Sequence, residues 1–139
     1  MDRYYLFRNA CMYGQLDIVK FLVSKDVDTI KDWAIRQACK YGHLEVVKFL
    51  VSKGANINNE DAFTQACWNG YIDIVKYFMS KGYNVIYGRP FTWACYGGRL
   101  EVVKYLMFKG VISKKNLDFM LSNDATPSHI INYLNQYKV

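Results

Sequence analysis

The chain has 139 residues, of which 52% are hydrophobic, so it is long enough for one folded domain with a sizeable core. It contains no apolar run near the roughly 18 residues of a membrane helix, and the opening MDRYYLFRNACMYG lacks the apolar stretch of a secretory signal. We therefore expect a cytoplasmic protein without membrane contact, whose net charge of +6 leaves binding to a polyanion open.

One segment recurs four times along the chain at a fixed spacing of 28 residues. The copies begin at Asn9, Gln37, Gln65 and Trp93 and read NACMYGQLDIVKFLVSK, QACKYGHLEVVKFLVSK, QACWNGYIDIVKYFMSK and WACYGGRLEVVKYLMFK. A fixed period of about 20 to 50 residues indicates a solenoid, in which each unit stacks only on its neighbours. A long surface of this kind favours binding another macromolecule over catalysis.

The second copy shows how one unit is expected to fold. Trp33–Tyr41 is predicted to be a short helix that ends at Gly42, and Leu44–Lys53 a second helix that ends at Gly54. The polar stretch 55–60 then connects to the next copy. Helices of about ten residues are too short to be stable alone, so stacking must stabilise them. The sequence therefore predicts an all-α repeat solenoid of helix-turn-helix units.

We expect residues 1–139 to form a single array. The predicted repeats are 5–32, 33–60, 61–88 and 89–116, followed by a degenerate C-terminal cap repeat over 117–139. Within the cap, Thr126 is predicted to be the N-cap of the last helix and Pro127 its first residue.

Lysines and aromatic residues recur in register, which favours structural roles for both. Each lysine of one column has an acidic residue three positions before it, the spacing of a helical ion pair, so a solvated face is favoured over a phosphate-binding track. The aromatic column is interpreted as packing between repeats rather than as a stacking platform for bases. The columns are Lys20, Lys48, Lys76 and Lys104, and Phe21, Phe49, Tyr77, Tyr105 and Tyr133.

Cysteine and histidine give no support for catalysis or for a bound metal. The four cysteines recur at the 28-residue period, so they lie along a line, one in each repeat. Stacked helices lie about 8–10 Å apart, farther than a disulfide or a shared zinc ion allows. We interpret them as buried apolar residues and expect no cofactor. His43 occupies a position that varies between copies, and it is predicted to be exposed.

The segment ACKYGHLEVVKFLVSKGANI resembles the centre of an ankyrin repeat, TPLHxAAxxGHLEVVxLLLxxGA. Ala38 and Cys39 match the two alanine positions, Gly42 matches the glycine between the helices, and Pro90 matches the proline that opens the first helix. The likeness covers residues ~5 to 115 and recurs in all four copies, which makes it specific. The amino-acid sequence of the repeats is most similar to that of the ankyrin arrays of giant DNA viruses that infect amoebae.

Two departures from the ankyrin pattern affect the expected fold. The TPLH tetrad is nearly gone, and the period is five residues shorter than in the family, because the connection after the second helix is shortened. In ankyrin proteins that connection forms a projecting β-hairpin. We therefore predict reduced or absent hairpins and almost no strand.

The resemblance also places a candidate binding surface. In ankyrin arrays the outward residues of each first helix line a concave groove, and variation between repeats there is where specificity is expected. The candidate partner-binding residues are Gln37, Lys40, Tyr41, Gln65, Trp68, Trp93 and Tyr96. Exposed tryptophan and tyrosine are typical of interface anchors. The alternative is that their rings fold over the shortened connections.

The sequence is thus interpreted as a non-enzymatic protein–protein interaction module, with a host-cell protein as partner if the viral resemblance holds. The alternative function is a basic scaffold for nucleic acid or a phosphorylated ligand, using Lys40, Arg36, Arg8 and the exposed aromatic residues. A further alternative is an assembly role, in which the array stacks on copies of itself.

Overall fold

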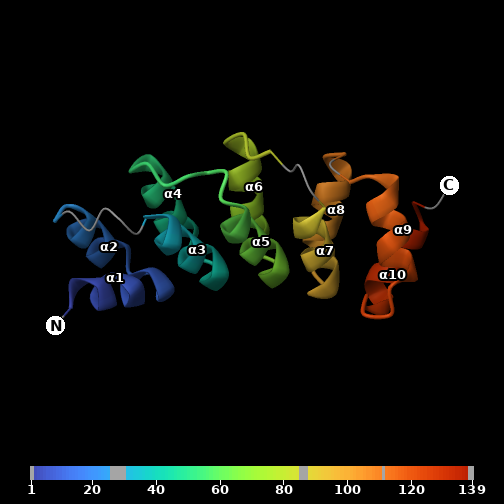
Figure 1. The fold of residues 1–139 in the computed structure, drawn as a ribbon, viewed down its shortest axis with the longest axis horizontal. Coiled ribbons are helices and arrows are strands. Elements are labelled where there is room, and N and C mark those ends of the chain that lie inside the picture. The colour runs from blue at the N-terminus through green and yellow to red at the C-terminus, as the bar shows by residue number, and fades with distance from the viewer. Residues whose placement is uncertain (1, 26–30, 85–87, 111, 138–139) are drawn as a thin grey trace.

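The chain forms an elongated array of helix pairs, with its two ends at opposite ends of the molecule (Figure 1). The computed structural model describes residues 2–25, 31–84, 88–110 and 112–137, and these contain ten helices and no strand. The predicted all-α repeat fold is therefore confirmed. The helices are α1 Arg3–Met12, α2 Leu16–Val23, α3 Lys31–Tyr41, α4 Leu44–Ser52, α5 Glu60–Asn69, α6 Ile72–Ser80, α7 Arg89–Tyr96, α8 Leu100–Phe108, α9 Lys114–Ser122 and α10 Ser128–Asn135.

Consecutive helices pack as antiparallel pairs, and the pairs stack side by side (Figure 1). The first helices of the pairs contact one another in the order α1, α3, α5, α7 and α9, while α2, α4, α6 and α8 form the second layer. The predicted helices of the second copy lie within two residues of α3 and α4. None of the described helices has the length and apolar character needed to cross a bilayer.

The core consists of small and large apolar residues on the first helices and of aliphatic or aromatic residues on the second. Several of these positions are occupied by the same residue type in each of the first four helix pairs. The fully buried residues include Ala10, Ala38, Ala66 and Ala94, the four cysteines that follow them, and Val19, Val47, Val75 and Val103.

A glycine between the two helices of each pair is covered by a side chain from the next pair. Gly14 has a φ of 69°, and a methyl group there would overlap the His43 ring. The same relation joins Gly42 to Tyr71 and Gly70 to Arg99. The prediction that His43 is simply exposed is wrong, because its half-buried ring donates from Nε2 to the Met12 carbonyl oxygen at 2.7 Å. This position therefore joins repeats.

The connection between α4 and α5 is short and is hydrogen-bonded to the start of α3. The Asn56 amide donates to Asp32 Oδ1 at 3.1 Å, and Asn59 Nδ2 donates to the Asp32 carbonyl oxygen at 3.1 Å. Asn59 also caps α5 by accepting from the Ala62 amide at 3.0 Å. No hairpin forms over residues 53–59. The shortened connections after the first and third copies fall on 26–30 and 85–87, outside the described residues.

The outer face carries a ladder of lysines and aromatic rings. Phe49 lies between Lys20 of the preceding pair and Lys53 of its own, with the two Nζ atoms 5.9 and 5.8 Å from the ring centroid. The arrangement recurs around Tyr77, with Lys48 and Lys81 at 6.0 and 5.8 Å, and around Tyr105, with Lys76 and Lys109 at 5.6 and 5.5 Å. The predicted inter-repeat role of the aromatic column thus includes cation–π contacts.

The predicted lysine–acid pairs form only where the acid is glutamate. Lys48 Nζ lies 3.5 Å from Glu45, and Lys104 Nζ lies 3.7 Å from Glu101. In the copies that carry Asp17 or Asp73 the shorter side chain makes no such ion pair with the described residues. These exposed pairs contribute little to stability, so the ring contacts are the common feature of the outer face.

The last helix pair starts earlier than the predicted cap boundary at residue 117. Ser113 and Asn116 form a capping box at the start of α9, in which the Asn116 amide donates to the Ser113 hydroxyl at 3.2 Å. The prediction for α10 is off by one residue, because its N-cap is Pro127 rather than Thr126. With a ψ of 147°, Pro127 is extended and cannot be the first helical residue.

Candidate partner-binding site

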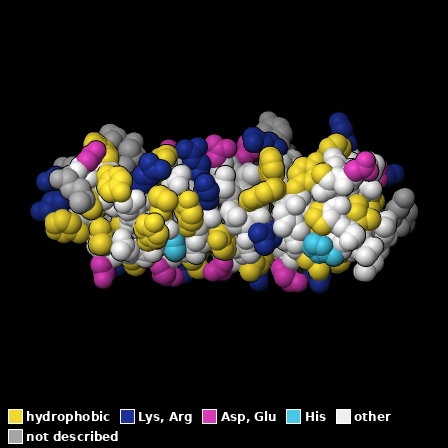
Figure 2. All heavy atoms as spheres, turned by 90° about the horizontal axis from the view of Figure 1, so that it is seen from below, with side chains coloured by type: hydrophobic (Ala, Val, Ile, Leu, Met, Phe, Trp, Pro, Cys, Tyr) yellow, Lys and Arg dark blue, Asp and Glu magenta, His cyan; other side chains and the backbone are white. Residues whose placement is uncertain are grey.

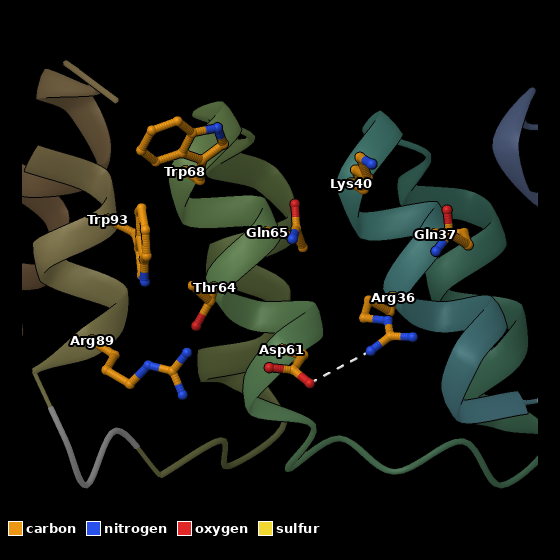
Figure 3. A pocket seen from close by; sticks show the side chains of 9 residues that line it. All are labelled: Arg36, Gln37, Lys40, Asp61, Thr64, Gln65, Trp68, Arg89 and Trp93. Carbon is orange, nitrogen blue, oxygen red and sulfur yellow. Dashed lines mark ion pairs between the residues drawn. The ribbon is translucent and has the colours of Figure 1, made fainter. Parts of the chain in front are cut away.

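An open cleft of about 480 Å³ crosses the first-helix face between α3, α5 and α7 (Figure 3). Helix α5 forms its floor, with α3 on one side and α7 on the other. Its lining residues are Arg36, Gln37, Lys40, Asp61, Thr64, Gln65, Trp68, Arg89 and Trp93. An open cleft suits an extended segment better than a small molecule, which usually binds in an enclosed pocket.

The structure brings five of the seven predicted residues into this cleft and leaves two outside it. The five are Gln37, Lys40, Gln65, Trp68 and Trp93. Tyr41 does not line the cleft, although Lys40 Nζ lies 5.5 Å from its ring centroid. The Tyr96 ring packs behind Trp93, and its hydroxyl accepts from Asn123 Nδ2 at 2.9 Å. Tyr96 therefore supports the cleft wall from outside the cleft.

Two tryptophans form one wall of the cleft. The Trp68 and Trp93 rings meet edge to face, with centroids 5.0 Å apart and planes at 77°, a favourable aromatic geometry. Their side chains are 38% and 37% exposed, so they hold each other in place while presenting ring surface to the cleft. Trp68 lies in the last turn of α5, away from the connection that enters this helix at Glu60.

Two arginines, each paired with a carboxylate, lie at the other end of the cleft. Arg36 Nη1 lies 3.6 Å from Asp61 Oδ2, and Arg89 Nη1 lies 3.5 Å from Glu60 Oε1. Both distances exceed the roughly 2.7–2.9 Å of a charge-assisted hydrogen bond, so the guanidinium groups are loosely held. Together with Lys40, they give the lining three cations against the single carboxylate of Asp61.

Thr64 is buried at the bottom of the cleft, with an unused hydroxyl. The residue is 9% exposed, and its Oγ1 makes no hydrogen bond with any described group. Thr92 occupies the same register one repeat later, and its hydroxyl donates to the Gly88 carbonyl oxygen at 2.9 Å. A buried hydroxyl without a hydrogen-bond partner is unfavourable by about 1–3 kcal/mol. Thr92 shows that a threonine at this helical position can bond the carbonyl oxygen four residues earlier, whereas Thr64 does not.

Four lining residues were absent from the predicted partner site: Arg36, Asp61, Thr64 and Arg89. Each lies four positions before a residue that was included, namely Lys40, Gln65, Trp68 and Trp93. On a helix, residues four apart share a face. Extending each predicted column by one turn toward the helix start would have found all four.

The residues of the polyanion alternative do not gather into one basic surface. Arg36 and Lys40 line the cleft, but Arg8 does not, and its guanidinium carbon instead lies 6.0 Å from the centroid of the Trp33 ring. Figure 2 shows another side of the array, where side chains of both charges are distributed along the length with hydrophobic side chains between them. That side offers no continuous positive track.

The cysteines are free, and all four side chains are buried. Burial raises the pKa of Cys11 and Cys95 from 9.0 to about 12, and it raises the pKa of Cys39 and Cys67 further. Across the described part of the chain, no group of three or more potential metal-ligating side chains comes together. The thiols therefore behave as core residues.

Comparison with known proteins supports the resemblance of this chain to the ankyrin-repeat family. Residues 3–61 match the model of ankyrin repeats in three copies, which is a little less than half of the chain. The helix pair seen in this range continues through α5–α8 in the same register. No curated protein matches the sequence. Ankyrin repeats are in general protein–protein interaction modules.

Proposed function

We propose that this ankyrin-type array is a non-enzymatic module that binds a partner protein in the cleft between α3, α5 and α7. The observation that carries the proposal is the Trp68–Trp93 pair, which remains more than one third exposed in an open cleft. Large aromatic residues at the centre of an interface supply much of its binding energy. Because the two rings already pack on each other, binding does not have to order them first.

The polar groups of the cleft suit recognition. Gln37 and Gln65 each offer a donor and an acceptor, which match the N–H and C=O groups of an extended backbone. No histidine or cysteine lines the cleft, and these side chains most often supply a base or a nucleophile.

We further propose that the partner is a host-cell protein and that binding takes place in the cytoplasm. The resemblance of the repeats to arrays of giant amoeba-infecting viruses supports a host target. Four thiols buried as core residues suit a reducing compartment, where free cysteines persist.

Affinity capture with the purified array, at low and at high salt concentration, tests the binding proposal. We expect a protein partner that is retained at high salt and lost when both Trp68 and Trp93 are replaced by alanine. Lys76→Ala is the matched control, because Lys76 lies on the outer face beside Tyr105. Retention of nucleic acid alone, released at high salt, would instead support the polyanion alternative.

The assembly alternative has one observation in its favour. Leu6 and Ile18 are 37% and 42% exposed, whereas the residues at the same register, Ala34 and Val46, are buried in the second copy. Light scattering of the purified chain tests this alternative. A concentration-dependent dimer that Ile18→Asp converts to monomer would support it.

A further inference from the structure

We propose that the partner segment is an extended peptide whose aspartate or glutamate side chain binds Thr64 and Arg89, with Arg36 adding positive charge across Asp61, beside an apolar side chain that packs on the tryptophans. This inference rests on the proposed function and names the chemistry of the partner. It follows from three features of the cleft: an unused buried hydroxyl, two loosely held guanidinium groups and an aromatic wall.

The Thr64 hydroxyl identifies where a ligand atom is missing. Its counterpart Thr92 satisfies its hydrogen by donating to the carbonyl oxygen four residues earlier, at 2.9 Å. Thr64 has the same helical setting, yet its Oγ1 has no partner among the described groups and is directed into the cleft (Figure 3). A ligand oxygen that accepts from Thr64 would remove this unfavourable burial.

The arginines on the two sides of α5 define the charge of that ligand oxygen. Figure 3 shows the Arg89 side chain extended from α7 and the Arg36 side chain extended from α3, both toward the part of α5 that carries Asp61 and Thr64. Each ion pair is 3.5 Å or longer, and the arginine side chains are 40% and 60% exposed. A carboxylate at Thr64 can therefore accept from Arg89 without first breaking a strong hydrogen bond, while Arg36 adds positive charge on the other side of Asp61.

The acidic residues of the cleft limit how much negative charge the ligand can carry. Asp61 lies in the lining, and Glu60 lies beside Arg89, so each arginine is already partly neutralised. A single carboxylate balances the remaining positive charge, whereas a nucleic-acid strand would bring successive phosphates against Asp61. The charge pattern favours an acidic peptide over a polyanion.

The opposite end of the cleft defines the neighbouring ligand group. Trp68 and Trp93 present apolar ring surface, while Gln65 on α5 and Gln37 on α3 line the part of the cleft farther from α7 (Figure 3). A peptide backbone can pair with the two amides while one side chain reaches Thr64 and another packs on the rings. Because the cleft is open along its length, the carboxylate is expected on a side chain within the segment rather than at a chain end.

Binding to a defined peptide array tests the proposal with the full chain. The probes are acetylated and amidated nonapeptides with one Asp or Asn and one Leu or Ser, placed at every mutual spacing in a Gly/Ser background. We expect the best Asp–Leu peptide to bind at least about tenfold more tightly than the matching Asn–Leu peptide. A further arm uses the Asn–Leu peptide with a free carboxyl terminus, and another uses a thymidine dodecanucleotide.

Thr64→Val and its matched control Thr92→Val make the test specific. Thr64→Val removes a hydroxyl that has no partner, so the midpoint of urea unfolding should stay unchanged or rise while the preference for Asp over Asn falls about tenfold. Thr92→Val removes an internal hydrogen bond, so it should lower the midpoint and leave the Asp preference intact. A structural role of Thr64 alone would not separate these two readouts.

Five outcomes overturn the inference, of which the fifth is that no peptide binds. The other four are that Asp and Asn peptides bind equally, that the Asn–Leu peptide with a free carboxyl terminus binds as tightly as the Asp–Leu peptide, that the oligonucleotide binds more tightly than the Asp–Leu peptide, and that the Asp preference survives Thr64→Val. If peptides bind without Asp preference but are lost in Trp68→Ala, the carboxylate site is wrong and the peptide-binding function stands. If no peptide binds, the carboxylate site is likewise wrong, and the affinity capture decides the function separately.

Discussion

The His43 ring covers Gly14 of the preceding pair and donates from Nε2 to the carbonyl oxygen of Met12 at 2.7 Å. One side chain thus bonds the turn of the earlier repeat while occupying the space that any Cβ at Gly14 would need. The same arrangement recurs where Arg99 covers Gly70 and donates from Nε to the Trp68 carbonyl oxygen at 3.0 Å. The inter-helix glycine is therefore required by its neighbour as well as by its own backbone.

Replacing Gly14 with alanine is expected to destabilise the array more than the same change at Gly110. Both glycines have a φ near 70°, but nothing lies within 4 Å of a Cβ at Gly110. Gly110→Ala should lower the free energy of unfolding by about 1–2 kcal/mol through backbone strain alone. Gly14→Ala should lower it by about 1–3 kcal/mol more, because the His43 ring must move. Urea unfolding measures both, and equal losses would show that the ring contact is unimportant.

Trp68→Ala and Trp93→Ala are each expected to weaken partner binding by about 2 kcal/mol or more. Their effect on folding should be smaller than that of Val75→Ala, because Val75 is fully buried between the helix layers and its truncation leaves a cavity. Calorimetric titration with the captured partner, together with urea unfolding, measures both properties.

Lys76→Ala is the control for the tryptophan variants and should leave binding unchanged. The Lys76 Nζ atom lies 5.6 Å from the centroid of the Tyr105 ring on the outer face, and the loss of this exposed contact should lower the stability by at most about 1 kcal/mol. Abolished binding in Lys76→Ala, with normal binding in both tryptophan variants, would move the interface to the outer face.

The ladder on the outer face is expected to couple neighbouring repeats. A double-mutant cycle with Lys48→Met and Tyr77→Leu should give a coupling free energy of about 0.5–1 kcal/mol, the range for exposed cation–π contacts. Lys48→Met combined with Tyr133→Leu is the control, since those residues lie three repeats apart, and it should give none. A coupling free energy near zero in the first cycle would show that the ring contacts do not stabilise the packing between repeats.

The buried thiols are expected to make the array less stable at alkaline pH. The pKa of Cys11 and Cys95 is raised from 9.0 to about 12 in the folded state, so between these pH values only the unfolded thiols ionise. The free energy of unfolding is thus unaffected by these thiols below pH 9 and falls as the pH rises toward 12, by about 1.4 kcal/mol per pH unit for each thiol.

Replacing Cys11 and Cys95 with alanine isolates this contribution from the lysines and tyrosines that titrate in the same range. The doubly substituted chain should lose stability more gradually between pH 9 and 12 than the natural chain. In addition, a thiol reagent should label the native array slowly and the urea-unfolded chain at once. Rapid labelling of the native array would contradict the observed burial.

The 28-residue period predicted the architecture well, because packing between like units repeats every contact. Ala38, Cys39, Val47 and Leu50 were placed correctly, since each recurs in register and is buried in the same way. The shortened connection also followed from counting residues, and 53–59 contain no strand. Residues that recur at the same position of every copy serve packing between repeats, so their burial can be predicted from the 28-residue pattern.

The cleft was predicted less completely, because its chemistry comes from residues that differ between copies. Thr64 and Thr92 have the same type and register, yet only the three-dimensional setting shows that Thr64 lacks a hydrogen-bond partner. The ion pairs of Arg36 and Arg89 join different helices, a relation that no spacing within one helix reveals. The role of His43 was missed because its partner, Met12, lies in another repeat.

The regular ladder and the regular glycine contacts also bear on how such a gene can change its length. Loss of residues 37–64, one whole period, would bring Tyr71 over Gly14 and Tyr77 beside Lys20. Both are contacts of kinds already present, at Gly42 with Tyr71 and at Lys48 with Tyr77. Unequal recombination between copies can therefore shorten or extend the array without a new core having to evolve, and the number of side-chain sets offered to a partner changes with it.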